Sequence, residues 1–207
     1  MKKHKVQSKR EAKVKKKRTN RWPQIISLSI MMIMIVSVVG FMWTQNIAET
    51  ANYENFAFKK QGQKWLVNVN GEDLNFQYLP DQVKQIPVDG KVQDLLNQRV
   101  LQLTYDPRQE FVQEIAQAAY YTGRNLNEVK KTVIINGLKE ANDYNIPVIT
   151  CDNATEFQPV IDFILSNESK VIVENNCIKL YARSGNDFTR VKDRLIYEAY
   201  GVLNGRT

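Results

Sequence analysis

The chain opens with a polar, basic stretch, continues with one long apolar run, and then changes to short alternating segments. Residues 24–43 contain no charged side chain, and the charge-free window extends from Trp22 to Ala48. About 20 helical residues span the roughly 30 Å hydrocarbon core of a bilayer. Since Ile, Met and Val occupy every face of such a helix, no polar stripe is left for water. We therefore predict a transmembrane signal-anchor helix over residues 23–44, with Trp22 and Trp43 at the two interfaces.

Two alternatives to an anchor remain open for this run. A cleaved signal peptide has an apolar region of about 7 to 15 residues followed by small residues at the cleavage site. Here the run is longer and ends in Gly-Phe-Met-Trp-Thr-Gln, although Ala48 and Ala51 follow a little further on. A buried core helix of a soluble protein is the other alternative, and the absence of a polar stripe argues against it.

The pattern after the apolar run predicts a stalk and one folded domain. Residues 45–55 are polar and show no period, so we expect a stalk there and a single domain over residues 56–204. Two alternating runs, 64–69 and 73–78, flank the dipeptide Asn70-Gly71. This arrangement is typical of a β-hairpin, because both turn residues tolerate positive φ.

The middle of the domain reads as a strand followed by a helix. Residues 100–105 alternate and predict the strand, and Asp106-Pro107 predicts the cap and first turn of the helix. Gly123 is expected to end that helix. Residues 126–142 fit either a short buried strand, on account of their β-branched run, or a second helix.

The C-terminal part predicts three short strands and a closing helix. The strands cover residues 160–165, 170–173 and 178–181, and the helix is expected to be capped by Asp187. Four charged residues of this helix are expected to face solvent: Lys192, Asp193, Arg194 and Glu198. The whole order predicts an α+β domain, or a small α/β sandwich, with a mixed sheet. A thioredoxin-like order is compatible with it, although the redox motif is missing.

Charge is distributed very unevenly along the chain. Residues 1–22 carry eleven basic side chains and one acidic side chain, a net charge of +10, whereas the remainder carries 18 basic and 21 acidic side chains. Basic residues that flank a first transmembrane helix stay in the cytoplasm. We therefore predict a single-pass protein with a disordered cytoplasmic tail over 1–22 and its C-terminal domain outside the cell membrane.

The basic tail has two kinds of candidate partner. A cluster of this size attracts anionic lipid headgroups, at about 1 kcal/mol per residue near the surface. Lys and Arg also neutralise nucleic-acid phosphates without reading sequence. We expect the lipid bilayer as the partner and no specific binding of nucleic acid.

The only two cysteines, Cys151 and Cys177, both lie in the predicted outer domain. An even count in an oxidising compartment favours one structural disulfide, which contributes roughly 3 kcal/mol on the loop-entropy model. The spacing fits neither a Cys-x-x-C pair nor a zinc site. Two free buried thiols and a catalytic cysteine are the alternatives.

Two triplets in the same domain match the acceptor pattern for N-glycosylation, at Asn153 and Asn167. Both lie in expected loops of a domain assigned to the outside, so the chain is a candidate glycoprotein. The alternative for Asn153 is a plain turn residue.

The sequence gives little support for catalysis. Its single histidine, His4, lies in the tail, which removes histidine-dependent triads and metal sites from the outer domain. Paired carboxylates could still hydrolyse a glycoside. The candidates are Asp106, Asp152, Asp162, Asp187 and Asp193. Each also fits a cap, a turn or an ion pair, and we expect no catalytic residue, no metal and no cofactor.

Several short sequence segments together resemble those of a group of uncharacterised archaeal-type single-span membrane proteins with a small extracytoplasmic disulfide-bonded domain. They are Trp65, Leu79-Pro80, Tyr105-Asp106-Pro107, and the segments 147–155, 176–178 and 192–197. The resemblance implies a membrane anchor and paired cysteines, and it implies no activity.

From these observations we expect a membrane-anchored extracytoplasmic domain that binds or scaffolds, as an accessory subunit of a cell-envelope complex. Tyr120-Tyr121 and the pair Tyr197 and Tyr200 are candidates for its interaction face, with core packing as the alternative. A carboxylate-based envelope hydrolase and a thiol–disulfide protein that uses Cys151 and Cys177 are the alternative functions.

Overall fold

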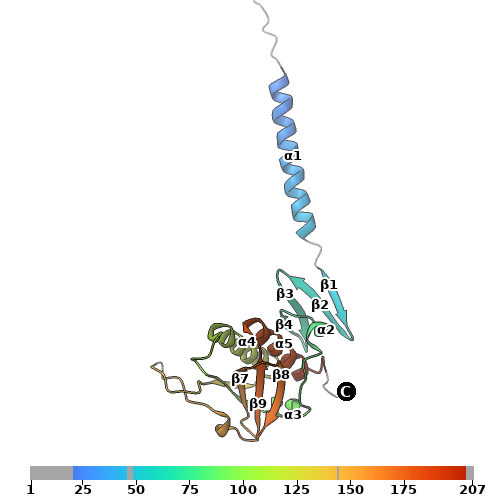
Figure 1. Ribbon diagram of the computed structural model, residues 1–207. Helices are drawn as coiled ribbons and strands as arrows, with labels where there is room; N and C mark the ends of the chain where they lie inside the picture. Colours follow the sequence, from blue (N-terminus) through green and yellow to red (C-terminus); the bar gives the residue numbers. More distant parts are fainter. Residues whose placement is uncertain (1–20, 46–48, 144, 204–207) are drawn as a thin grey trace, which may run out of the picture. The chain divides into compact units, whose positions relative to one another are not determined.

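The computed structural model describes residues 21–45, 49–143 and 145–203 (Figure 1). The chain divides into two compact units, Met1–Ile47 and Ala48–Thr207, and each is described by itself. Of the basic tail predicted over residues 1–22, residues 1–20 lie outside the described residues, and Trp22 already belongs to helix α1.

The first unit contains one long apolar helix. Helix α1 covers Trp22–Gln45, and the part from Trp22 to Gly40 is long and apolar enough to cross a membrane. Every residue from Trp22 to Gly40 is exposed within the described structure, which is the opposite of a soluble core helix. By length and composition, α1 is a candidate membrane anchor or signal sequence.

The second unit starts with a four-stranded antiparallel meander. Its strands, in spatial order, are β1 (Thr50–Tyr53), β2 (Phe56–Gln61), β3 (Lys64–Val69) and β4 (Glu72–Phe76). The predicted hairpin is β3–β4, and its turn residues Asn70 and Gly71 have φ values of 53° and 88°. Strand β1 lies within the stretch predicted to be a polar stalk, and it pairs with β2.

A five-stranded mixed sheet forms the other half of this unit. Its strands are β5 (Val100–Tyr105), β6 (Val133–Asn136), β7 (Val160–Leu165), β8 (Lys170–Glu174) and β9 (Cys177–Ala182). The spatial order is β6-β5-β7-β9-β8, with only β8 antiparallel to its neighbour. The predicted α+β domain with a mixed sheet is therefore confirmed. Strand β9 lies between β7 and β8, so these two consecutive strands do not form a hairpin.

The helices of the domain are α2 (Pro80–Val83), α3 (Val92–Leu96), α4 (Val112–Lys130) and α5 (Gly185–Ala199), with a 3₁₀ turn η1 at Cys151–Asn153. Helix α4 corrects two predictions. It starts six residues after Asp106, whose carboxylate instead accepts a hydrogen bond from the Arg108 N–H in the preceding turn. It also continues through Gly123, because a residue without Cβ lets Leu103 and Ile134 pack against the helix.

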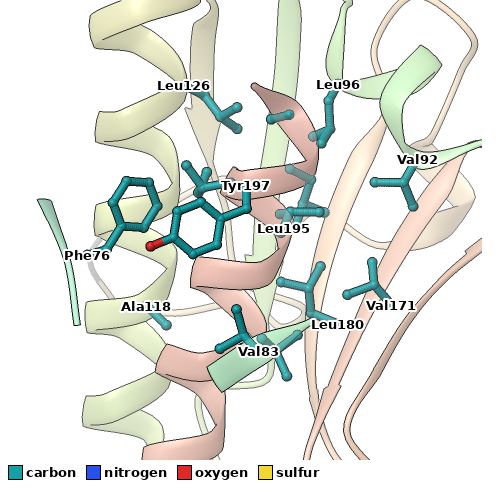
Figure 2. Packing of buried hydrophobic residues seen from close by; sticks show 14 of the residues in the cluster. Phe76, Val83, Val92, Leu96, Ala118, Leu126, Val171, Leu180, Leu195 and Tyr197 are labelled. Carbon is teal, nitrogen blue, oxygen red and sulfur yellow. The ribbon is translucent and has the colours of Figure 1, made fainter. Parts of the chain in front are cut away.

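Helix α5 lies between the two sheets, and this overturns the expectation that its charged residues face solvent. Figure 1 shows α4 and α5 between the meander and the mixed sheet. On the meander side the Tyr197 ring stacks on Phe76, and on the other side Leu195 packs with Leu180 of β9 (Figure 2). The four residues predicted to be exposed are all buried: Lys192, Asp193, Arg194 and Glu198.

These buried charges are paired along α5. Lys192 contacts Asp193, and Arg194 contacts Glu198 at 2.8 Å. The Asp193 carboxylate also accepts hydrogen bonds from the N–H groups of Gln77 and Tyr78, at 2.9 Å each. The pairs make burial possible, because an unpaired buried charge is very costly. The start of α5 differs as well, since Ser184 is its N-cap and Asp187 lies three residues later.

The face of the mixed sheet that points away from α4 and α5 is covered in part by residues 137–143 and 145–159, which we call the covering segment. The Thr104 hydroxyl donates to the Ile149 carbonyl at 2.7 Å. The predicted disulfide between Cys151 and Cys177 is present, with Cα atoms 5.4 Å apart. It ties the segment to strand β9, and Ile149, Val160 and Cys177 form a small second core there.

Candidate functional site

The exposed large apolar side chains of the domain come from three parts of the chain. Among the described residues after α1, they come from the outer face of α4, from β6 and from the segment that follows β6. They are Tyr120, Val133, Ile135, Ile146, Val148 and Phe157. Exposed apolar side chains on and beside one edge strand are candidates for an interaction site. We name this set the β6 surface.

Strand β6 has an open edge. The N–H of Val133 donates to the Arg99 carbonyl and the N–H of Gly137 donates to the Leu103 carbonyl, each at 2.8 Å. Because a parallel ladder uses alternate residues, the N–H and C=O groups of Ile134 and Asn136 face away from β5. Strand β6 is the first strand of the sheet, with no further strand beside it among residues 49–143 and 145–203.

The open edge is already occupied just past its end by the chain itself. Leu138 N–H donates to the Pro147 carbonyl at 3.0 Å, and Ile149 N–H donates to the Leu138 carbonyl at 2.9 Å. Gly137 makes this close return possible, because a Cβ there would lie 2.5 Å from Ile149 Cδ1. The segment 147–149 therefore pairs with the chain on the side facing away from β5. An added strand would lie on this same side, beside β6.

The two faces of β6 offer different surroundings to such a strand. Ile134 points toward α4, where it packs on Gly123. Val133 and Ile135 lie on the opposite face, and both are exposed. The side chains of an added strand would alternate between these two faces.

A cavity of about 160 Å³ lies on the α4 side of the edge. Its walls include Ala116, Tyr120, Asn136 and Ile146. Engineered cavities of about 150 Å³ with apolar walls are large enough to bind benzene. The cavity therefore has room for one leucine-sized or phenylalanine-sized side chain. Tyr105 also lines it, and burial raises the pKa of its phenol.

The tyrosines that the sequence singles out separate into two groups. Tyr120 is exposed and packs edge-to-face on Tyr121, with ring centroids 5.3 Å apart, so it belongs to the β6 surface. Tyr197 is fully buried and Tyr200 donates its hydroxyl to the Asn125 carbonyl. Burial raises the pKa of both of these phenols, as expected for core residues.

The candidate carboxylates are dispersed over the domain. Asp162 is buried in β7 and its Oδ2 lies 2.7 Å from Lys139 Nζ. Burial raises the pKa of Asp162, although Lys139 and Lys179 lower it. One oxygen of Asp162 has no hydrogen-bond partner within the described structure. The pair Lys139–Asp162 connects the start of the covering segment to the sheet.

Two further carboxylates, Asp187 and Asp193, lie on α5 and are paired with neighbouring groups. Burial raises the pKa of Asp193, while Lys192 and two backbone N–H groups lower it. Burial also acts to raise the pKa of Asp187, but hydrogen bonds from Arg183 and Ser169 outweigh it and keep the pKa below its ordinary value. Asp152 lies in the turn η1 and is exposed.

Three of the remaining predicted residues, Asn153, Asn167 and Trp22, lie at the surface. Asn167 is exposed in the turn between β7 and β8, and Asn153 is exposed in η1, where its carbonyl oxygen accepts a hydrogen bond from the Thr150 N–H at 2.7 Å. Trp22 begins α1 and is exposed, and Trp43 lies in the last turns of that helix. Glycosylation and membrane-interface roles stay predictions. Within the described residues no cluster of three His, Cys, Asp or Glu side chains could hold a metal ion.

Sequence reasoning missed most of the β6 surface. The alternation of Val133 and Ile135 is visible in the sequence, but its meaning depends on β6 being an edge strand. Ile146, Val148 and Phe157 give no periodic signal, since they lie in an irregular segment. No protein-family model, curated protein or solved structure matches the chain, so the geometry alone carries the functional interpretation.

Proposed function

We propose that the chain is a single-pass membrane protein whose outer domain binds an extended segment of another cell-envelope protein. In this proposal the basic tail lies in the cytoplasm against anionic lipid headgroups, α1 spans the bilayer, and the disulfide-bonded domain lies outside. The charge asymmetry supports this orientation, and the disulfide supports an oxidising location.

The β6 surface is the observation that carries the binding function. A partner segment added along β6 would satisfy the outward N–H and C=O groups of Ile134 and Asn136, in the manner of β-strand addition. One of its apolar side chains would enter the cavity beside Tyr120, and its neighbours would cover Val133 and Ile135. The expected partner is thus an extended segment with apolar residues on both faces.

Site-specific photocrosslinking in the native membrane tests this binding. A crosslinkable residue is placed at Ile135 in the full-length chain, and at Gln61, an exposed position on β2, as the matched control. We expect a discrete adduct from position 135, whose crosslinked peptide in the partner alternates apolar residues. Adding Val133→Lys should abolish the adduct, since a charge on an edge opposes strand addition.

Equal labelling from positions 135 and 61 would contradict the proposal. An adduct with twice the mass of the chain would show that the partner is a second copy of this chain rather than another envelope protein. The orientation is tested separately by adding protease to intact cells, where loss of the C-terminal domain and survival of the N-terminal tail are expected. Protection of the C-terminal domain would overturn the outside location.

A further inference from the structure

The domain contains a second concave region, far from β6 in the strand order. A cavity of about 390 Å³ lies between the loop after α2, the turn from β7 to β8, and the first turns of α5. Its walls include Pro87, Ser169, Lys170, Arg183 and Arg190. Strand β8 is the other edge of the mixed sheet, so this cavity and the β6 surface are separate.

The walls of this cavity are held in place by backbone contacts. Val171 N–H donates to the Pro87 carbonyl at 2.9 Å, and Asp89 N–H donates to the Val171 carbonyl at 3.0 Å. The loop after α2 therefore runs along β8 as an additional short strand-like contact. The cavity is thus formed by secondary structure rather than by one flexible loop.

The cationic side chains on the walls are organised by one buried carboxylate. Asp187 Oδ2 accepts hydrogen bonds from the Ser169 hydroxyl at 3.1 Å and from Arg183 Nε at 2.8 Å. Its other oxygen lies 3.5 Å from Arg190 Nη1. Both oxygens of Asp187, which also lines the cavity, therefore have partners within the fold, and the carboxylate orients the two guanidinium groups.

Asp187 orients the Arg183 guanidinium but uses only one of its nitrogens as a hydrogen-bond donor. Its only hydrogen bond in the described structure uses Nε, and its side chain is 56% exposed. A guanidinium held at Nε presents its two terminal nitrogens as a preorganised pair for an oxyanion. In addition, the buried Nε of Arg190 has no hydrogen-bond partner among the described residues. A buried donor of this kind is usually satisfied by a bound group or water.

Lys170 adds a third positive charge at the rim. It pairs with Glu168 at 2.8 Å, but Glu168 is exposed and Lys170 is only half-buried, so this pair is weak and Lys170 can exchange its partner. The N-terminus of α5 begins beside Arg183 and contributes further positive potential. We propose that this cavity binds a phosphate group, with Arg183 and Lys170 as its principal ligands. This inference does not depend on the partner proposed for β6.

The phosphate could belong to a free anion or to a lipid headgroup, and the experiment separates these sources. The full-length chain in non-ionic detergent micelles is titrated with inorganic phosphate and, separately, with soluble short-chain phosphatidylglycerol, at ionic strength matched with chloride. We expect a saturable rise in Tm and measurable binding by calorimetry. Response to phosphate assigns a free-anion site, and response to the lipid alone assigns a headgroup site.

Substitutions in the cavity wall test whether the phosphate group binds there. Because the basic tail also attracts anions, the decisive comparison is between chains that all keep the tail. Arg183→Gln should weaken binding at least about tenfold, the usual effect of losing hydrogen bonds to a charged group. Arg124→Gln removes an arginine that pairs with Glu128 on the exposed face of α4 and should leave binding unchanged.

Lys170→Gln provides a second variant, at a half-buried position at the start of β8, and it should weaken binding several-fold. Unchanged binding in both Arg183→Gln and Lys170→Gln would overturn the proposal, and so would the absence of a response to either probe.

Discussion

The ring of Tyr197 on α5 stacks on the ring of Phe76 on β4, with centroids 4.2 Å apart and an interplanar angle of 17°. The Tyr197 hydroxyl donates to the Tyr78 carbonyl at 2.6 Å. One tyrosine therefore joins the central helix to the meander by both packing and a hydrogen bond. This contact explains why the meander and the mixed sheet share a single core.

Two substitutions separate the packing of Tyr197 from its hydrogen bond. Phe76→Ala removes the stacked ring from a buried position, and should lower the free energy of unfolding by about 3 to 5 kcal/mol. Tyr197→Phe keeps the ring and should cost only about 1 kcal/mol. Urea denaturation of the purified chain measures both values. Equal losses for the two variants would show that the hydroxyl, rather than the ring, connects the layers.

Gly137 is expected to be required for the return of the covering segment. Gly137→Ala would place a methyl group against Ile149 and should destabilise the domain by about 1 to 3 kcal/mol, the usual cost of overpacking. Gly90→Ala is the matched control, because a Cβ there meets nothing within 4 Å. The double variant Gly137→Ala/Ile149→Ala should lose less than the sum of the single losses, and strict additivity would contradict the contact.

The disulfide should stabilise the position of the covering segment. Replacing Cys151 and Cys177 by serine releases a closure between residues 26 apart in sequence. The loss is expected to be about 3 kcal/mol on the loop-entropy model. Hydrogen exchange should accelerate first at Ile149 and its neighbours, while α5 stays protected. Uniform acceleration across the domain would instead indicate that the bond stabilises the fold as a whole.

Asp187 should make the domain sensitive to acid. Its pKa in the folded state lies below the ordinary value of 3.8, so the native state binds this proton less readily than the unfolded state. The stabilisation is therefore fully present above pH 3.8 and is lost as the pH falls through the lower, folded pKa. The stability difference between the wild type and Asp187→Asn should be constant near neutrality and shrink below pH 3.8. A difference that does not change with pH would contradict the role of this carboxylate.

Local patterns were sufficient to predict several elements of this protein. The Asn70-Gly71 turn, strand β5 and the three C-terminal strands follow from alternation and turn chemistry, because these signals act over a few residues. The apolar character of α1 is also a local signal, and the pairing of the only two cysteines follows from their number. The boundaries of α4 were predicted less well, since Gly123 is retained inside that helix by its packing on Leu103 and Ile134.

Amino-acid order alone thus determined one apolar helix, one α+β domain and one disulfide. Tertiary structure decided which charges are buried, since Lys192 and Asp193 look like surface residues until a second sheet covers α5. It also decided that β6 is an edge, and that Arg183 and Lys170 meet across a cavity. The physical reason is that periodicity reports one buried face of an element, whereas burial on a second face and contacts between distant segments depend on how the layers stack.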